Sequence, residues 1–326
     1  MRELTYAQAI NEALRQCMKE DERVILLGED IGVYGGVFQV TAGLLNEFGP
    51  ERVIDTPIAE AGFTGASVGA ALTGMRPVVE IMFIDFTTVA MDMIINQMAK
   101  MHYMFGGRGK VPMVLRINIG AGRGTAAQHS QSFHALFMHI PGMYVAVPST
   151  PYDAKGLMIE AIRNDNPVVF VEHKKLYVEK GDVPEEGYAI PFGQAEIKRE
   201  GSDLTIVATH ALVARSLNAA EEAAKEGIDV EIVDPRTLVP LDINTISASV
   251  NKTGRAIIVV QACYTGSYAS HISHEITLNC FSGMKCPVRV VSSYDVPPPM
   301  AYTLENENMP NPDRIAKSIK EALKTN

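Results

Sequence analysis

The 326-residue sequence lacks several features that would assign it to familiar classes of protein. It contains no tryptophan and only four cysteines, and the spacing of these cysteines matches neither a zinc finger nor a redox motif. No run of about eighteen uninterrupted apolar residues occurs, and residues 1–4 do not resemble the start of a signal peptide. We therefore expect reduced thiols in a cytoplasmic protein without a membrane partner.

Positive charge is also scarce. The chain has 29 Lys and Arg against 38 Asp and Glu, which gives a formal net charge of -9. This balance, together with the absence of a basic cluster, disfavours nucleic acid or an anionic membrane as a partner. Neither half of the chain contains a glycine-rich loop of the Walker or dinucleotide type, so the sequence gives no support to nucleotide binding by those routes.

Short β-branched runs alternate with helical patterns through the first half of the chain. Strands are predicted at 24–27, 78–84, 113–119, 144–147 and 168–172, and helices at 5–19, 60–73, 87–104 and 152–164. Thr150 followed by Pro151 is typical of a helix start. Buried strands that are separated by helices indicate an α/β fold with a mainly parallel, doubly wound sheet.

The pattern is lost at 177–203, where charged and turn-forming residues predict a linker. A second alternation follows, with strands predicted at 204–209, 230–233, 256–260 and 288–291 and helices at 211–226, 242–251, 268–279 and 312–324. We therefore predict a first domain at 1–176, a linker at 177–200 and a second α/β domain at 201–326.

Glu60 is the first candidate catalytic residue. It ends the run Asp-Thr-Pro-Ile-Ala-Glu at 55–60 and begins a predicted helix that places Gly62, Gly65 and Gly69 on one face. A carboxyl group among small residues loses water, and it can then hold or donate a proton near neutral pH. The alternative interpretation is a salt-bridged glutamate at a helix start.

His129 is the second candidate. It belongs to the run Gln-His-Ser-Gln-Ser at 128–132, which follows a glycine-rich stretch after a predicted strand. Such a loop belongs at the carboxyl end of the sheet, where α/β proteins place their sites. His129 is suited to moving a proton or donating to an oxyanion, although Ser130 and Ser132 can also be read as helix caps. His134 and His139 are interpreted as flanking or interface residues.

Two further groups lie near predicted strand ends. Strand alternation over 80–86 would place Met82 and Phe86 on one face, where they can clamp a flat ring or simply form core. Glu29 directly follows the first predicted strand. Glu29, Glu60, Met82, Phe86 and His129 are therefore expected to come from strand ends of one sheet.

Several motifs in this order support a resemblance to a known family. They are Leu-Leu-Gly-Glu-Asp at 26–30, Asp-Thr-Pro-Ile-Ala-Glu at 55–60, Arg-Pro-Val-Val-Glu-Ile-Met at 76–82, Ala-Gln-His-Ser-Gln-Ser at 127–132 and Asn-Pro-Val-Val-Phe at 166–170. The chain resembles, over essentially its whole length, the beta subunit of the thiamine-diphosphate-dependent 2-oxo acid dehydrogenases, which include pyruvate, branched-chain 2-oxo acid and acetoin dehydrogenases. The resemblance implies a transketolase-like pyrimidine-binding domain followed by a transketolase C-terminal-like domain.

The resemblance also implies roles for individual residues. Glu60 matches the glutamate that bonds the aminopyrimidine ring nitrogen of the cofactor and favours its imino tautomer. Glu29, Ile58, Met82 and Phe86 match the positions that line the aminopyrimidine pocket. His129 matches a histidine near the reacting carbon, suited to substrate orientation or to acyl transfer to a lipoyl group.

A potassium ion is also implied by the resemblance. By position, its ligands would be Met113, Ala161, Ile162, Asn164 and Asn166. Many members of the family have an acidic residue where this chain has Asn164.

The metal-diphosphate half of a thiamine site is missing. Enzymes of this kind hold the diphosphate and Mg²⁺ through a Gly-Asp-Gly segment, whereas Gly181-Asp182 here continues to Val183. The resemblance therefore implies that an alpha subunit supplies the metal ligands in an α2β2 heterotetramer, within a multienzyme complex built on a dihydrolipoamide acyltransferase core. The second domain is expected to serve assembly and to contain no catalytic residue.

The substrate and two other functions stay open. The donor is pyruvate, a branched-chain 2-oxo acid or acetoin. A split transketolase-like enzyme acting on sugars is one alternative, although phosphosugars call for several basic side chains that this chain does not offer near His129. A non-catalytic scaffold subunit is the other, against which the presence of both Glu60 and His129 argues.

Overall fold

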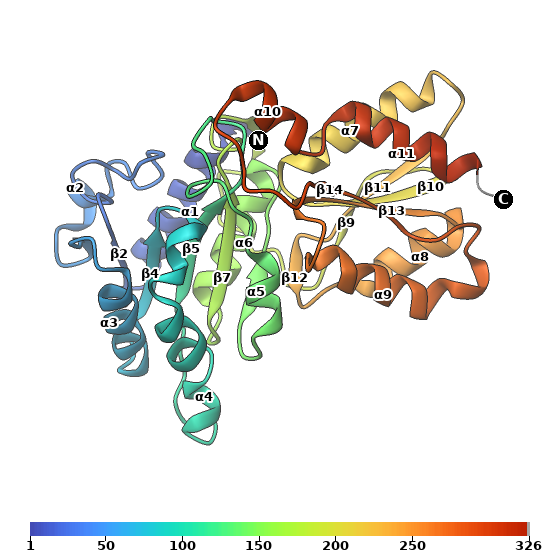
Figure 1. Ribbon diagram of the computed structural model, residues 1–326. Coiled ribbons are helices and arrows are strands. Elements are labelled where there is room, and N and C mark those ends of the chain that lie inside the picture. The colour runs from blue at the N-terminus through green and yellow to red at the C-terminus, as the bar shows by residue number, and fades with distance from the viewer. Residues whose placement is uncertain (325–326) are drawn as a thin grey trace. The chain divides into compact units, whose positions relative to one another are not determined.

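The computed structural model describes residues 1–324, which form two compact units by their internal contacts (Figure 1). The first unit comprises Met1–Ile119 and Leu136–Phe192, and the second comprises Gly120–Ala135 and the residues from Gly193 onward. The loop 120–135 thus packs with the second unit, although both of its ends continue into the first. No helix within residues 1–324 is long and apolar enough to cross a membrane. The domain boundaries predicted at 176 and 200 stay predictions.

The first unit contains the following elements. Its strands are β1 (Arg2–Thr5), β2 (Val24–Gly28), β3 (Val53–Asp55), β4 (Arg76–Ile81), β5 (Val114–Ile119), β6 (Tyr144–Ala146), β7 (Val168–His173) and β8 (Lys180–Val183). Its helices are α1 (Tyr6–Glu20), α2 (Leu44–Phe48), α3 (Glu60–Leu72), the 3-10 helix η1 (Ile84–Thr88), the π-helix η2 (Met93–Met98), α4 (Met101–Met104) and α6 (Pro151–Arg163). Helix α5 (His134–His139) begins at the end of the loop 120–135.

A parallel sheet forms the centre of the first unit. Within this unit the strands lie in the order β6-β7-β5-β4-β2-β3, and every neighbouring pair is parallel. Helices lie in front of the sheet and behind it in Figure 1. The runs Val-Ile-Leu-Leu in β2 and Val-Val-Phe-Val in β7 are buried throughout, as expected for strands that are covered on both faces. The α/β fold predicted from the sequence is confirmed.

Local sequence explains where the long helices of this unit begin. Thr5 and Gln8 form a reciprocal capping box at the start of α1. Thr150 accepts from the backbone N–H of Asp153, and Pro151 occupies the first turn of α6. The helix start predicted at 150–151 is therefore confirmed.

Three stretches of the sequence were assigned the wrong local structure. The strand predicted at 78–84 ends at Ile81, and the helix predicted at 87–104 is divided into η1, η2 and α4. The predicted linker contains β8, which pairs antiparallel with β1, and β9 (Glu196–Arg199), which pairs antiparallel with β11 (Val230–Asp234). Tertiary pairing provides the hydrogen bonds there, so the strands form without an apolar repeat.

The second unit has its own sheet with a helical layer on each side. Its remaining strands are β10 (Leu204–Ala208), β12 (Thr237–Val239), β13 (Ala256–Cys263) and β14 (Arg289–Ser293). Its helices are α7 (Ala211–Ala224), α8 (Ile243–Thr253), α9 (Tyr268–Cys280), the 3-10 helix η3 (Phe281–Gly283), α10 (Tyr302–Asn308) and α11 (Pro312–Lys324). The sheet order is β14-β13-β10-β11-β9, parallel except for β9. Figure 1 shows α7 and α11 on one face and α8 and α9 on the other.

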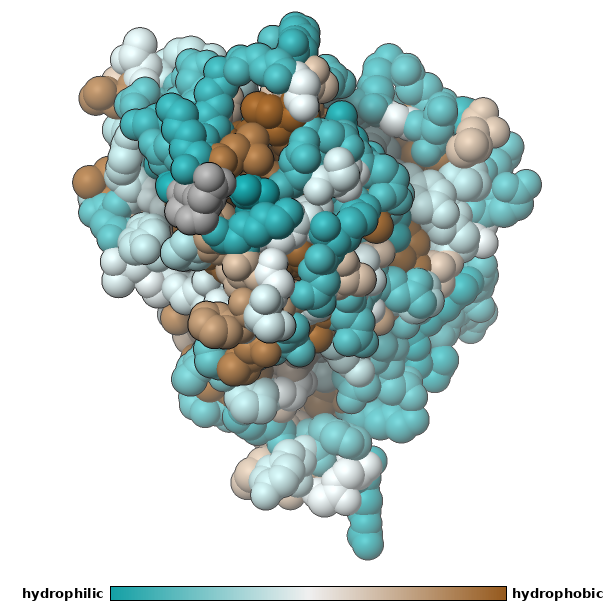
Figure 2. Space-filling model, turned by 90° about the vertical axis from the view of Figure 1, so that its right-hand side faces the viewer, coloured by the Kyte–Doolittle hydropathy of each residue, from teal (hydrophilic) through white to brown (hydrophobic). Residues whose placement is uncertain are grey.

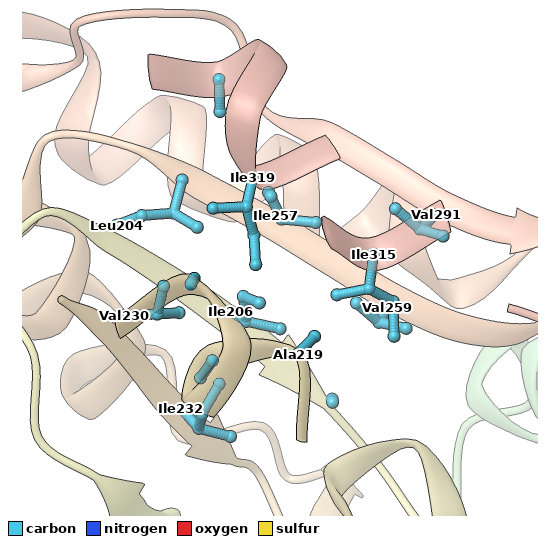
Figure 3. Packing of buried hydrophobic residues seen from close by; sticks show 14 of the residues in the cluster. Leu204, Ile206, Ala219, Val230, Ile232, Ile257, Val259, Val291, Ile315 and Ile319 are labelled. Atoms are coloured by element: carbon cyan, nitrogen blue, oxygen red, sulfur yellow. The ribbon is translucent and has the colours of Figure 1, made fainter. Parts of the chain in front are cut away.

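The core on the α7–α11 side of this sheet is aliphatic. Figure 3 shows Ile315 and Ile319 of α11 pointing toward Ile257 and Val259 of β13. Ile315, Ile319 and Ile257 are completely buried. Burial of each such side chain stabilises the fold by about 1.5–3 kcal/mol.

The surface in Figure 2 is mainly hydrophilic, with smaller apolar patches between the polar residues. Apolar side chains of the second unit that remain exposed include Leu278 (66%) at the end of α9 and Phe281 (77%) in η3. Large exposed apolar residues that lie close together in the chain mark candidate contact sites for other proteins.

Candidate active site

Glu60 lies at the start of α3, in the first unit. It is the first residue of the helix, and its side chain is buried, with the residue 8% exposed. The N-cap residue, Ala59, makes no side-chain capping hydrogen bond to the helix. The carboxylate therefore lies near the positive end of the helix dipole, which favours negative groups.

Glu29 directly follows β2, and its electrostatic environment links it to Glu60. Burial, then the charge of Glu60, then that of Asp30 raise the pKa of the Glu29 carboxyl. Its Oε1 atom is buried and has no hydrogen-bond partner within residues 1–324. The structure therefore brings Glu29 and Glu60 together, in a place that favours a proton or a ligand donor on Glu29.

Two polar atoms that sequence reasoning missed lie at the same edge of the sheet. Thr56 follows β3, and its Oγ1 is buried without a partner among the described residues. Asn118, near the end of β5, donates through Nδ2 to the Met82 carbonyl, while its Oδ1 is likewise buried and unbonded in the described chain. Buried polar atoms are rarely left unsatisfied, so a ligand at this edge of the sheet would satisfy them. Only their place after predicted strands was visible in the sequence.

The hydrophobic candidates are placed differently from the prediction. Because β4 ends at Ile81, strand alternation does not set the side-chain directions of Met82 and Phe86. Both residues are half-buried, and the Phe86 ring packs edge-on against Phe83 at 6.1 Å between centroids. Ile58 is 83% exposed in the segment before α3.

The loop after β2 is fixed by hydrogen bonds and by a close approach of backbone. Asp55 accepts from the N–H groups of Gly32 (2.6 Å) and Val33 (3.2 Å). A Cβ atom on Gly28 would lie 2.8 Å from the carbonyl oxygen of Glu80 on the neighbouring strand β4. Glycine is therefore required where the chain passes from β2 to Glu29.

A buried ionic network connects the central strands next to these residues. Arg116 donates to Glu80 (2.5 Å) and, through Nε and Nη2, to both carboxylate oxygens of Glu172 (2.7 and 2.9 Å). The Tyr177 hydroxyl donates to Glu172 at 2.8 Å. Burial disfavours the charged guanidinium, but Glu172 and Glu80 outweigh it and hold the pKa of Arg116 above its ordinary value. The network fixes β4, β5 and β7 relative to one another.

Sequence reasoning missed this network, although a signal was present. Arg116 pairs in register with Glu80 of β4, and Glu172 of β7 pairs with Asn118, two positions farther along β5 than Arg116. A charge inside an apolar strand requires an opposite charge on its neighbour. Once the order of the strands is known, the ion pairs of Arg116 with Glu80 and Glu172 can therefore be predicted from the sequence.

His129 belongs to the loop 120–135 and hence to the second unit, whereas Glu29 and Glu60 belong to the first. The residue is half-buried, and its N–H donates to the Ala126 carbonyl at 3.3 Å. Thr125 donates from its hydroxyl to the His129 carbonyl at 3.1 Å. Ala126 has a φ of 58°, so the turn before His129 is tight. The turn therefore holds the His129 backbone at both its N–H and its carbonyl.

The residues suggested for potassium have other partners. Arg76 donates through Nη1 to the carbonyls of Ile162 (3.0 Å) and Asn164 (2.9 Å), and through Nη2 to Asp165 (2.6 Å). A positive guanidinium thus already lies among these oxygens, and a second cation there would be repelled.

Met113 and Asn164, two of the other suggested ligands, have hydrogen-bond partners as well. The Met113 carbonyl accepts from the Val168 N–H at 3.0 Å. The Asn164 side-chain oxygen accepts from the N–H (3.0 Å) and the Nδ2 (3.2 Å) of Asn166. Ala161 lies buried within α6. As arranged here, these residues do not fit a potassium ion. Within residues 1–324 there is also no cluster of three or more His, Cys, Asp or Glu side chains that would hold a metal.

Comparison with known proteins identifies both halves of the chain. Residues 2–180 match the transketolase pyrimidine-binding domain, and residues 193–315 match the transketolase C-terminal domain. The chain is 47% identical to the acetoin:2,6-dichlorophenolindophenol oxidoreductase subunit beta of Cupriavidus necator, over 99% of this chain and 98% of the relative. It is 46% identical to the pyruvate dehydrogenase E1 component subunit beta of Bacillus subtilis, over 99% of each chain. A solved split-gene transketolase, described as an inactive beta4 tetramer, superposes with a TM-score of 0.82 at 22% identity over 99% of both chains, which shows the fold.

Proposed function

Because the chain belongs to the family of beta subunits of 2-oxo acid and acetoin dehydrogenases, we propose that it supplies the aminopyrimidine side of a thiamine diphosphate site. The observation that carries this proposal is the buried carboxylate of Glu60 at the start of α3, beside Glu29 with its raised pKa. A carboxylate in such a place is suited to holding a proton at a ring nitrogen.

The residues around Glu60 fit the aminopyrimidine half of the cofactor. Glu29, Thr56 and Asn118 each keep a buried oxygen without a partner within residues 1–324, and Met82 and Phe86 leave half-buried apolar surface. Polar atoms of this kind suit the amino group and ring nitrogens, and thioether and aromatic side chains suit a flat ring. When bound, thiamine diphosphate supplies a thiazolium carbon that attacks the substrate carbonyl and an electron sink for the bond that breaks.

Glu60 and His129 have separate roles in the proposal. Glu60 holds a proton at the aminopyrimidine ring nitrogen, and its buried position keeps water from competing for that proton. His129 orients the substrate or moves a proton during acyl transfer to a lipoyl acceptor. The hydrogen bonds that Thr125 and Ala126 make to the His129 backbone orient the residue for this task.

The proposal includes partners that complete the site. An alpha subunit supplies the Mg²⁺ ligands for the diphosphate, in an α2β2 heterotetramer in the cytoplasm. The second unit provides contact surface for this assembly and for a dihydrolipoamide acyltransferase core. The exposed Leu278 and Phe281 support a role in protein contact, because large exposed apolar side chains favour burial by a partner.

The substrate belongs to the class shared by the relatives. We propose a 2-oxo acid, such as pyruvate or a branched-chain acid, or acetoin, as the donor. The two relatives compared above are named for acetoin and for pyruvate at nearly equal identity, so the family alone does not separate these donors. Turnover of the assembled enzyme with an artificial electron acceptor, measured against the three donors in parallel, identifies the substrate.

The test of the proposed function is Glu60→Gln in the enzyme assembled with its alpha subunit. Loss of the carboxylate is expected to lower kcat on the order of 10²-fold or more, with the fold and assembly unchanged. Glu51→Gln, at an exposed glutamate, is the matched control and is expected to retain full activity. Full activity of Glu60→Gln with saturating cofactor would contradict the assignment.

Calorimetry on the chain alone tests the shared site. Without metal ligands for the diphosphate, the isolated chain is expected to bind thiamine diphosphate weakly in the presence of Mg²⁺. Micromolar or tighter binding would mean that this chain completes a site without the alpha subunit.

A further inference from the structure

The loop that contains His129 is attached to the second unit at two points, one on each side of the histidine. The loop leaves the first unit after β5 and returns to it through α5, yet residues 120–135 pack with the second unit. Gly124 bonds to α10, and His134 contacts the segment between β10 and α7. In the sequence, His129 lies midway between these two attached residues, five positions from each.

The first attachment is a hydrogen bond to a buried carboxylate. Glu305 of α10 is completely buried, and its Oε2 accepts from the Gly124 N–H at 3.0 Å. Its Oε1 has no partner among the described residues. A Cβ atom on Gly124, whose φ is 66°, would lie 3.3 Å from the Met300 carbonyl, so the loop approaches the chain before α10 closely.

A buried carboxyl group that accepts one hydrogen bond destabilises the fold relative to an apolar side chain at the same position. Removing a charged group from water is unfavourable unless its hydrogen bonds are replaced. An aliphatic side chain of similar size would fill the same volume without that cost. We therefore attribute the burial of Glu305 to its hydrogen bond with the Gly124 N–H, which fixes the direction and distance of that N–H.

The second attachment is a pair of buried histidines. Nε2 of His134 and Nε2 of His210 lie 3.1 Å apart, and each residue is at most 2% exposed. The His134 ring also packs edge-on against Tyr268 at 5.1 Å between centroids, and the Tyr268 hydroxyl bonds to Thr209 at 2.7 Å. His210 has a φ of 53°, a backbone conformation that residues other than glycine rarely adopt. One imidazole donates to the other, which joins the end of the loop to the start of α7.

We propose that the second unit positions His129, with Glu305 and the His134–His210 pair as positioning residues. The first attachment acts on the backbone of the loop, and the second acts on its buried end. The inference rests on the proposed role of His129 in orientation or acyl transfer. It gives the second unit a part in turnover that is separate from assembly.

The main test uses Glu305→Leu in the enzyme assembled with its alpha subunit. Leucine fills the site but accepts no hydrogen bond, so the loop is expected to shift and kcat to fall on the order of 10²-fold. The affinity for thiamine diphosphate is expected to stay within about twofold, because the aminopyrimidine residues belong to the first unit. Glu305→Gln keeps an acceptor oxygen for Gly124 and is expected to restore most of the activity. Glu307→Leu, the same change at an exposed position of α10, is the matched control and should behave as wild type.

A double-mutant cycle distinguishes positioning from general damage. If Glu305 acts through His129, then Glu305→Leu should lower kcat no further in a His129→Ala background. Wild-type kcat in Glu305→Leu, or multiplicative losses in the double variant, would overturn the proposal. A His129→Ala enzyme with full activity would instead remove the proposed role of His129, which is a separate outcome.

His134→Gln tests the second attachment if Glu305→Leu does not assemble. It leaves Glu305 in place and removes the imidazole contact with His210. The same pattern is expected, with reduced kcat, unchanged cofactor affinity and no additivity with His129→Ala. Independent losses in that cycle would overturn the inference on their own.

Discussion

The two units share an α/β architecture, but they differ in what their sheets enclose. The first unit places Arg116 among carboxylates in its central strands and leaves buried oxygens of Glu29, Thr56 and Asn118 unbonded within residues 1–324. The second unit packs the α7–α11 face of its sheet with aliphatic side chains such as Ile257 and Ile319. Buried polar groups cost stability, so their concentration at one sheet edge indicates a binding site, whereas an aliphatic face indicates a support.

Comparison of the attachments of the His129 loop refines this contrast. The second unit packs the α7–α11 face of its sheet with aliphatic side chains, yet the buried side chains of Glu305 and His210 bond to the loop 120–135. A unit that served assembly alone would need neither. If the proposed positioning of His129 is correct, the second unit supports a residue of the site in addition to packing its own core.

The largest expected effect on stability tests the buried network of the first unit. Arg116→Leu leaves Glu80 and Glu172 buried without their cation, and we expect it to reduce the free energy of unfolding by about 3–5 kcal/mol. Urea denaturation of the chain measures this loss. The triple variant Arg116→Leu, Glu80→Gln, Glu172→Gln removes the uncompensated charges and should recover much of the stability. A triple variant as unstable as the single one would show that the network is not governed by charge compensation.

The second expected effect tests the aliphatic core of the second unit. Ile319→Ala removes a completely buried side chain that faces β13, and we expect a loss of about 2–4 kcal/mol from transfer and cavity terms. The isosteric change Ile319→Leu should cost less than about 1.5 kcal/mol and is the matched control. If Ile319→Ala reduced the free energy of unfolding by less than about 0.5 kcal/mol, the surrounding side chains would have filled the cavity, and the packing would be less rigid than proposed.

The sequence was sufficient for most of the fold because its signals are local. Apolar runs and helix caps located β2, β5, β7, α1, α3 and α6 of the first unit to within a few residues. In the second unit they located β10, β11, β13, β14, α7, α8, α9 and α11, but not β12 or α10. The strands β1, β8 and β9 escaped prediction because their hydrogen bonds come from partners distant in the sequence. The break after Ile81 escaped it because η1 contains the same apolar residues that continue a strand pattern.

The candidate site was predictable only in part, for a related reason. Glu29 and Glu60 follow predicted structural boundaries and carry a charge that a core does not tolerate, so they stand out in the sequence. Asn118 and Thr56 are common residue types whose importance depends on burial without a partner. Nothing in the glycine-rich stretch before His129 indicates which unit it packs against, because Glu305 lies far along the chain.

A smaller effect with a defined pH dependence sharpens the assignment of the first unit as the site. Burial, Glu60 and Asp30 raise the pKa of Glu29 in the folded chain above its unfolded value of about 4.3. The folded state therefore holds the proton more tightly, and this contribution to stability is present below the unfolded pKa and is lost as the pH rises through the folded pKa. Glu29→Gln should melt near wild type at about pH 4 and, at pH 7, higher by a few degrees, on the order of 2 °C.

Calorimetric scans from pH 4 to pH 7 measure this difference. Glu51→Gln, at an exposed position, should show no such trend. A melting difference for Glu29→Gln that is constant across the range would mean that burial does not disfavour the Glu29 carboxylate in the folded chain.

The smallest expected effect concerns potassium. It tests whether the residues that the family resemblance suggested as ligands bind this ion. Arg76 already donates to the carbonyls of Ile162 and Asn164. A cavity of about 420 Å³ that Arg76 lines is also lined by the positive side chains of Arg23, Arg108 and Lys110 and by the carboxylate of Asp165, so positive side chains predominate there. The electrostatic potential there disfavours a further cation. Exchange of 100 mM KCl for 100 mM choline chloride should therefore shift the melting temperature of the chain by less than about 1 °C, since an ion that binds only the folded state would raise it. Arg76→Met should lower stability by removing the guanidinium from these oxygens, and titration of this variant with K⁺ tests whether the ion replaces the guanidinium. A K⁺-specific rise in the melting temperature of the wild-type chain, absent with choline at equal ionic strength, would contradict this account and restore the carbonyl set as a potassium site.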